Sequence, residues 1–103
     1  MSKLKLVANP TFTATVLIPV AGASPVAAVF TFKHRTKAAL DEFIASRADK
    51  SDGESFKAMV QAWDLECELN DENIDLLLQN YIGSALVTYR SYIDELVQAK
   101  TKN

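Results

Sequence analysis

The residues whose side chains could take part in catalysis or metal binding are concentrated in one stretch, "WDLECELNDENIDLLLQNY", which runs from Trp63 to Tyr81. It holds the only Trp, the only Cys and six of the thirteen acidic residues of the chain. Carboxylates at this density can ligate a hard cation or act as an acid–base pair, and a thiolate can act as a nucleophile. The candidates for chemistry are therefore Asp64, Glu66, Cys67, Glu68, Asp71, Glu72 and Asp75.

The spacing of these acids argues against a metal or catalytic site. A calcium loop needs a central Gly and a closing Glu, and the stretch contains no Gly while apolar residues separate its first acids. Asp71, Glu72 and Asp75 instead fall at a predicted helix N-terminus, where negative charge is favourable by ~0.3–1 kcal/mol. We interpret the segment Asp64–Asp75 as a solvated linker and helix start, with an acidic protein-docking surface as the alternative.

Cys67 and His34 do not form a recognisable nucleophile pair in the sequence. Cys67 has no second Cys for an internal disulfide, and His34 lies far earlier, in "KHRT". Cys67 is predicted to be a small buried apolar residue, and His34 a solvated strand end or a small docking surface. Glycine-rich phosphate motifs and zinc-ligand spacing are also missing. The sequence therefore predicts no catalytic residue, no cofactor and no metal site, so the protein is not expected to be an enzyme.

Length and composition predict a single domain over residues 1–103. Apolar residues make up 49% and charged residues 23%, which is typical of a soluble globular chain. The net charge of −2 offers no basic surplus for phosphate contacts, so no nucleic-acid partner is expected. No stretch approaches the ~20 apolar residues that cross a bilayer, and no signal peptide is recognisable. These features predict an intracellular protein without a membrane partner.

The spacing of apolar residues changes from period two to helical along the chain. Alternation in "TFTATVLI" and "VAAVFTFK" predicts an antiparallel β-hairpin over about residues 3–33, with a loop from Pro19 to Pro25 and "KLKLV" as a candidate third strand. About residues 36–100 are predicted to form four helices that pack on the hairpin, the second of them reaching Trp63. The predicted helix starts are Thr36, Ser51, Asn70 and Ser84. This order of elements predicts an α+β fold.

The last helix carries more apolar residues than one core-facing stripe needs. Its predicted apolar side consists of Leu86, Tyr89, Ile93, Leu96 and Val97. Either the helix is buried on two sides, or part of it forms a surface for self-association or for a partner helix. The candidate self-association or client surface comprises Tyr81, Leu86, Tyr89, Tyr92 and Ile93.

Four segments give the chain a resemblance to a known family. In order, they are "ANPTFTATVLIPV", "FTFKHRT", "AWDL" and "LLLQNYIGSALVTYRSYIDELVQAKTKN". Over nearly its whole length the chain resembles the small tail assembly chaperones of long-tailed, siphovirus-type bacteriophages. The resemblance implies a self-associating, non-virion protein in the cytoplasm of the infected bacterial host. It also implies that this protein binds the long, largely helical tape measure protein and keeps it soluble until tail tube subunits polymerise around it.

The resemblance also implies that a longer form is made by a programmed translational frameshift. The sequence "TKN" is compatible with this, since Lys102–Asn103 can be encoded by an A-rich run on which a ribosome slips. The family has no catalytic residues to carry over. The alternative function is a structural minor tail or head-completion protein that is retained in the particle.

Overall fold

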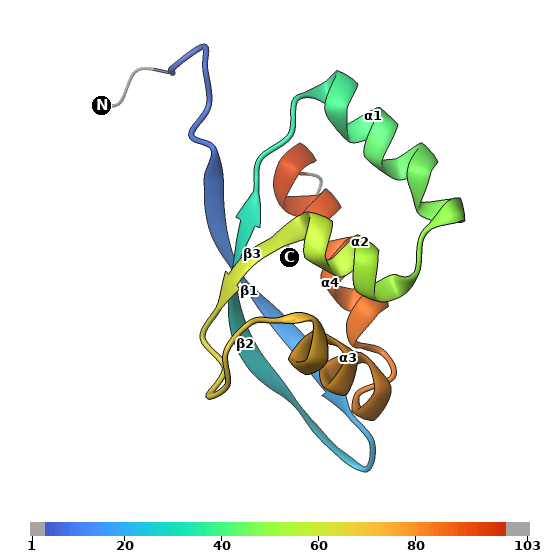
Figure 1. Ribbon diagram of the computed structural model, residues 1–103. Coiled ribbons are helices and arrows are strands. Elements are labelled where there is room, and N and C mark those ends of the chain that lie inside the picture. The colour runs from blue at the N-terminus through green and yellow to red at the C-terminus, as the bar shows by residue number, and fades with distance from the viewer. Residues whose placement is uncertain (1–3, 99–103) are drawn as a thin grey trace.

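A computed structural model describes residues 4–98, in which one small sheet is covered by helices on one face (Figure 1). The elements in chain order are β1 (Thr11–Val20), β2 (Ala23–Lys33), α1 (Lys37–Ser46), the 3₁₀ helix η1 (Arg47–Asp49), α2 (Asp52–Met59), β3 (Val60–Trp63), α3 (Asp71–Asn80) and α4 (Ser84–Val97). The prediction of an α+β fold with an N-terminal antiparallel hairpin and four α-helices is confirmed.

The sheet has the order β1-β2-β3, and both pairs of neighbours are antiparallel. Opposite residues share a face, so the pairs Phe12–Phe32 and Val16–Ala28 place apolar side chains beneath the helices. The intervening residues, such as Thr15, point to the opposite face, which is open to solvent. The period-two pattern of the sequence therefore identified the covered face correctly.

The hairpin turn is shorter than the predicted Pro19–Pro25 loop. A two-residue turn joins the strands, and it contains Gly22 with φ +76°, a left-handed conformation that glycine adopts without a steric cost. The pairing becomes irregular between Ile18 and Val20, and both prolines lie at this irregularity. Proline lacks an N–H donor, and an irregular end of the ladder tolerates that loss. The prolines therefore bend the hairpin without ending its strands.

The third strand is not the predicted one. In "KLKLV" residues 4–7 form no strand, and Lys3 lies outside the described residues. The third strand is β3, where the second helix was predicted to continue to Trp63. Helix α2 ends at Met59, and Val60 adopts an extended backbone with φ −108° and ψ 123°. The extended conformation is stabilised by hydrogen bonds to β2 and by the Trp63 ring, whose centroid lies 6.4 Å from that of Phe30. The sequence did not predict this strand because the spacing of apolar residues does not distinguish a helix end from a short buried strand.

The predicted helix starts are confirmed, three of them by their capping geometry. The Thr36 hydroxyl accepts from the Ala39 N–H at 3.2 Å, and the Asn70 side chain accepts from the Asn73 N–H at 2.8 Å. Ser51 and Glu54 form the predicted reciprocal capping box, and Ser84 is the first residue of α4. The helical part was predicted to reach about residue 100; α4 ends at Val97, and residues 99–103 lie outside the described part of the chain.

Tyr92 stands at the centre of the core and joins three elements. Its hydroxyl donates to the Lys33 carbonyl at 2.7 Å and accepts from Arg35 Nη1 at 2.9 Å. Arg35 Nη1 also donates to the Ala58 carbonyl at 2.8 Å. The largest fully buried aromatic residues around this network are Phe30, Phe32 and Phe56. The end of β2, the end of α2 and the middle of α4 are thereby fixed to one another.

Candidate functional site

Helix α4 packs on the core through an unexpected side. Ser84, Thr88 and Tyr92, each four residues apart, are 0% exposed and face inward. Their two short members let the helix lie close to β1. Immediately before them, a Cβ added at Gly83 would lie 3.0 Å from Pro19 Cγ, so the Pro19 ring would have to move by a few tenths of an ångström to admit a larger residue. Close approach to the sheet, and not the sum of apolar side chains, decides which side is buried.

The opposite side of α4 carries a row of four residues, three of them apolar, named here the outer stripe, which consists of Leu86, Arg90, Ile93 and Val97. Leu86 is 50% exposed and Val97 is 52% exposed, whereas Ile93 is partly buried and packs against the core. The steps between successive members are four, three and four residues. This spacing is the seam pattern by which one helix packs along another. The outer stripe therefore has the spacing that a helix–helix contact uses.

Tyr89 lies beside this stripe but is engaged within the chain. The Arg47 guanidinium carbon lies 3.6 Å from the centroid of the Tyr89 ring, and the Phe43 ring lies 6.5 Å away. The stacked guanidinium fixes the ring between η1 and α1. Tyr89 therefore presents only part of its surface to a partner.

A second apolar surface is a groove of about 560 Å³ between α3, the hairpin turn and the segment that joins β3 to α3. We name it the α3 groove. Its apolar lining comprises Val20, Trp63, Leu65, Leu76, Leu77 and Tyr81. Leu76 is 54% exposed and Tyr81 is 40% exposed, so both offer apolar area to an incoming chain. Asn73, Asn80 and Cys67 supply the polar part of the lining.

Two of the six acids of the Asp64–Asp75 segment have structural partners. The Asp64 carboxylate accepts from the Val29 N–H at 2.9 Å, and the Asp64 N–H donates to the Val29 carbonyl at 3.1 Å, which continues the ladder beyond β3. Asp71 forms an ion pair of 2.8 Å with Lys57. Within residues 4–98, no group of three or more His, Cys, Asp or Glu side chains is placed to hold a metal ion. The segment is a linker and helix start, as interpreted from the sequence.

Cys67 is exposed, so the prediction that it is buried was wrong. The linker that contains it forms one wall of the α3 groove, and the Trp63 indole N–H donates to the Cys67 carbonyl at 2.8 Å. His34 is partly exposed at the strand end, where its backbone N–H donates to the Pro10 carbonyl at 2.8 Å.

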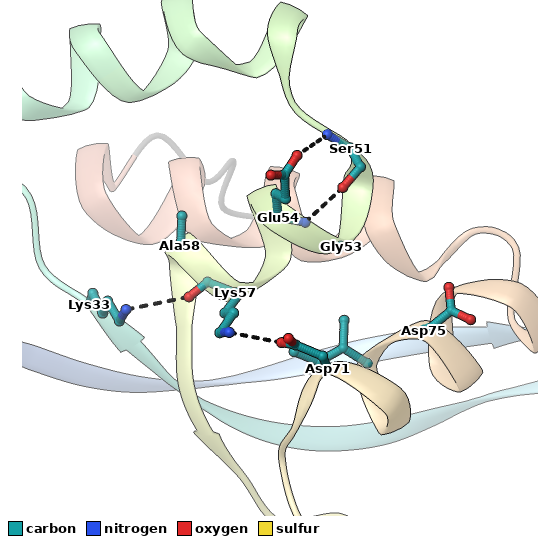
Figure 2. A pocket seen from close by; sticks show the side chains of 9 residues that line it. Lys33, Ser51, Gly53, Glu54, Lys57, Ala58, Asp71 and Asp75 are labelled. Carbon is teal, nitrogen blue, oxygen red and sulfur yellow. Dashed lines mark hydrogen bonds and ion pairs between the residues drawn. The ribbon is translucent and has the colours of Figure 1, made fainter.

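A charged depression of about 620 Å³ lies between the starts of α2 and α3 (Figure 2). Figure 2 shows Lys57 pointing toward Asp71, and Lys33 Nζ lies 3.4 Å from the Lys57 carbonyl. The Ser51 backbone N–H donates to the Glu54 carboxylate, and this hydrogen bond holds the pKa of Glu54 below its ordinary value. The Ser51 hydroxyl lowers the same pKa to a smaller extent. The Lys57–Asp71 ion pair joins the two helices and the Ser51–Glu54 hydrogen bonds cap α2, so we interpret the depression as a structural junction.

The five residues of the predicted surface separate into different environments. Tyr92 is 0% exposed, so a partner of the folded chain cannot reach it. Tyr81 lies at the α3 groove, Leu86 and Ile93 lie on the outer stripe, and Tyr89 lies beside that stripe. The candidate surface predicted from sequence omitted Arg90, Val97 and the exposed groove residue Leu76, although Val97 was placed on the predicted apolar side of the helix. The four-three-four spacing on α4 was the available signal for the stripe.

No helix in the described range, residues 4–98, combines the length and apolar character needed to span a membrane.

The family model for phage tail assembly chaperones matches residues 1–103. The chain belongs to this family, as the four sequence segments predicted. No curated protein and no solved structure matches the chain significantly. Family membership indicates a tail protein as partner and suggests a non-enzymatic role.

Proposed function

We propose that this chaperone binds the tape measure protein through the outer stripe of α4 and keeps it soluble during tail assembly. The observation that carries the proposal is the exposure of Leu86 and Val97, 50% and 52%, at the spacing of a helix–helix seam. A largely helical tape measure protein exposes apolar helix faces until tube subunits cover them. A helix laid along the outer stripe would bury apolar rows on both partners.

Arg90 gives this contact a second property. A charged residue at a seam position lowers the stability of helix pairing while it selects register and partner. A client acid opposite Arg90 would supply that selection. Binding of intermediate strength suits a chaperone that tail tube subunits must displace.

We propose the remaining properties because the sequence resembles this family, whose members share them. The chaperone acts in the cytoplasm of the infected bacterial host without catalysis, a cofactor or nucleic acid, and it is absent from the mature virion. It self-associates, and a longer frameshifted form would share this fold and join the same assemblies. The nucleotide sequence at the end of the reading frame tests the frameshift directly.

Co-expression with the tape measure protein tests the client surface. The double variant Leu86→Glu/Val97→Glu is expected to reduce co-purified tape measure protein at least tenfold. The double variant Ala38→Glu/Ala45→Glu is the matched control, since both alanines are exposed on α1 and the added charge is equal. Equal recovery by the two double variants would reject the outer stripe as the client surface.

Mass spectrometry of purified virions tests the chaperone role itself. The protein is expected to be missing from virions yet present in complexes with tape measure protein. Stoichiometric amounts in mature particles would favour a structural minor tail or head-completion protein instead.

A further inference from the structure

We propose that copies of the chain associate head to tail, with the N-terminal arm of one copy, residues 4–7, inserted into the α3 groove of the next. This deepens the self-association included in the proposed function, on which it rests, and it requires no client. It assigns the α3 groove to a second copy of the chain and leaves the outer stripe of α4 to the tape measure protein.

The arm is an apolar segment that the fold leaves uncovered. Leu4, Leu6 and Val7 are 90%, 97% and 84% exposed. The arm leaves the start of β1 and runs away from both the sheet and the helices (Figure 1). Three large aliphatic side chains in seven residues of exposed chain are a costly arrangement in water, which insertion into an apolar groove would relieve.

The charges of the arm and of the groove region are complementary. Lys3 and Lys5 are basic, and no acidic residue precedes Asp41. Between Lys57 and Arg90, by contrast, the chain has six carboxylates and no Lys or Arg. Asp71 and Asp75 line the charged depression, whereas Glu66, Glu68 and Glu72 belong to the two segments that form the groove, the linker and α3. The occupant that suits this groove is an apolar segment with basic residues.

The placement of these acids around the groove supports the same occupant. Glu66 and Glu68 flank the groove residue Cys67 and are exposed. Glu72 is exposed one helical turn before Leu76, on the side of α3 that borders the groove. A lysine of an inserted arm would meet these carboxylates at the rim while the leucines contact the apolar lining.

The arm cannot reach the groove of its own molecule. It joins β1 at Thr11, whereas the groove lies at the other end of β1, beside Val20 and the hairpin turn (Figure 1). The ten residues of β1 span about 33 Å, and the chain from Leu4 to Thr11 extends at most about 25 Å. The occupant must therefore be the arm of another copy.

This separation also determines the type of assembly. Each copy offers an arm at one end and a groove at the other, so the contact is heterologous and adds copies in one direction. Such contacts produce rings when the rotation closes and open filaments when it does not. Because the rim contacts are ionic and exposed, the association is expected to weaken as salt is raised.

A disulfide cross-link between copies tests the proposal, and Cys67 is already in the groove. The variant Leu6→Cys is oxidised gently as the purified full chain without client. The expected product is a ladder of dimers and larger species whose tryptic peptides join position 6 to Cys67. Leu17→Cys is the matched control, because Leu17 is 59% exposed on the open face of the sheet. It is expected to give at least fivefold less product joined to Cys67.

Two outcomes would overturn the arm-in-groove contact. One is a set of links that join only two position-6 thiols or two Cys67 thiols. The other is equal yield from position 17, which would indicate the open sheet face as the interface. The variant Leu76→Asp, with light scattering as the readout, provides a second route: it is expected to reduce the mass of the assemblies, and unchanged mass would contradict the proposal. Since no client is present, these results are independent of the test of the outer stripe.

Discussion

The two sides of α4 reverse the usual distribution of residues. Its inner side buries Ser84 and Thr88 together with Tyr92, whereas its outer side leaves Leu86 and Val97 half exposed. Small polar residues are mostly found outside and large aliphatic ones inside. The inner side is explained by close approach to β1, which the fold requires. The outer side has no such explanation within the chain, and for that reason we propose that it binds a client.

The largest expected effect is on the inner side, at Tyr92. Tyr92→Ala removes a fully buried ring and is expected to lower the free energy of unfolding by about 3–5 kcal/mol. Tyr92→Phe keeps the ring but leaves the Lys33 carbonyl and Arg35 without the hydroxyl, and should cost about 1–3 kcal/mol. Urea unfolding measures both.

The matched change on the outer side, at Leu86, is expected to have little effect on stability. Leu86→Glu is expected to alter the free energy of unfolding by no more than about 0.5 kcal/mol, since exposed substitutions seldom do more. A loss similar to that of Tyr92→Ala would show that the outer side also stabilises the fold.

The α2 cap provides an intermediate effect that is remote from both sides of α4. Ser51→Ala removes the cap to the Glu54 N–H at 3.1 Å and is expected to cost about 1 kcal/mol of stability. Binding of the tape measure protein should be unchanged when folded protein is compared. Urea unfolding measures the stability and co-purification measures the binding. Weaker binding by the folded variant would contradict the expectation that the α2 cap does not affect the client surface.

The pKa of Glu54 gives this cap a defined pH dependence. Hydrogen bonds from Ser51 lower the pKa of Glu54 in the folded state below the ordinary value of 4.5. Its contribution to stability is therefore complete above that value and is lost as pH falls through the lowered pKa. The stability difference between the native chain and Glu54→Gln should shrink on acidification, which thermal unfolding at several pH values measures. A stability difference that does not change with pH would contradict the stabilising hydrogen bonds between Ser51 and the Glu54 carboxylate.

A small stabilising effect is expected at Thr88, on the inner side. Its hydroxyl is buried and has no hydrogen-bond partner within residues 4–98. Thr88→Val keeps the shape and removes the unpaired hydroxyl, so the free energy of unfolding is expected to rise by about 1 kcal/mol or less. Thr15→Val, at an exposed position of β1, is the control. A clear loss of stability at Thr88 would show that the hydroxyl is satisfied in solution.

Local chemistry made some of this structure predictable. The caps at Thr36, Ser51 and Asn70 and the alternation of β1 and β2 act over a few residues, and all were identified from sequence. The family was also identified from sequence. Tertiary contact produced the errors: the free edge of β2 converted the expected helix end at Trp63 into β3, and the linker path exposed Cys67.

The candidate surface was predictable only in part. Sequence spacing marked α4 as too apolar for a single stripe, and Leu86 and Ile93 do lie on its outer side. The same reasoning included Tyr92, because a tyrosine with a polar hydroxyl is compatible with either side of a helix. The hydroxyl's partners, the Lys33 carbonyl and Arg35, come from a distant part of the chain.

The sequence by itself determined the two strands of the hairpin, the helix starts, the family and the separation of charge between a basic beginning and an acidic middle. These follow from composition and from interactions within a few residues. Only the tertiary structure decided which side of α4 is buried, where the third strand forms, and that the arm and the α3 groove lie at opposite ends of β1. Those features depend on how closely distant backbones approach, and residue spacing along one segment carries no measure of that distance.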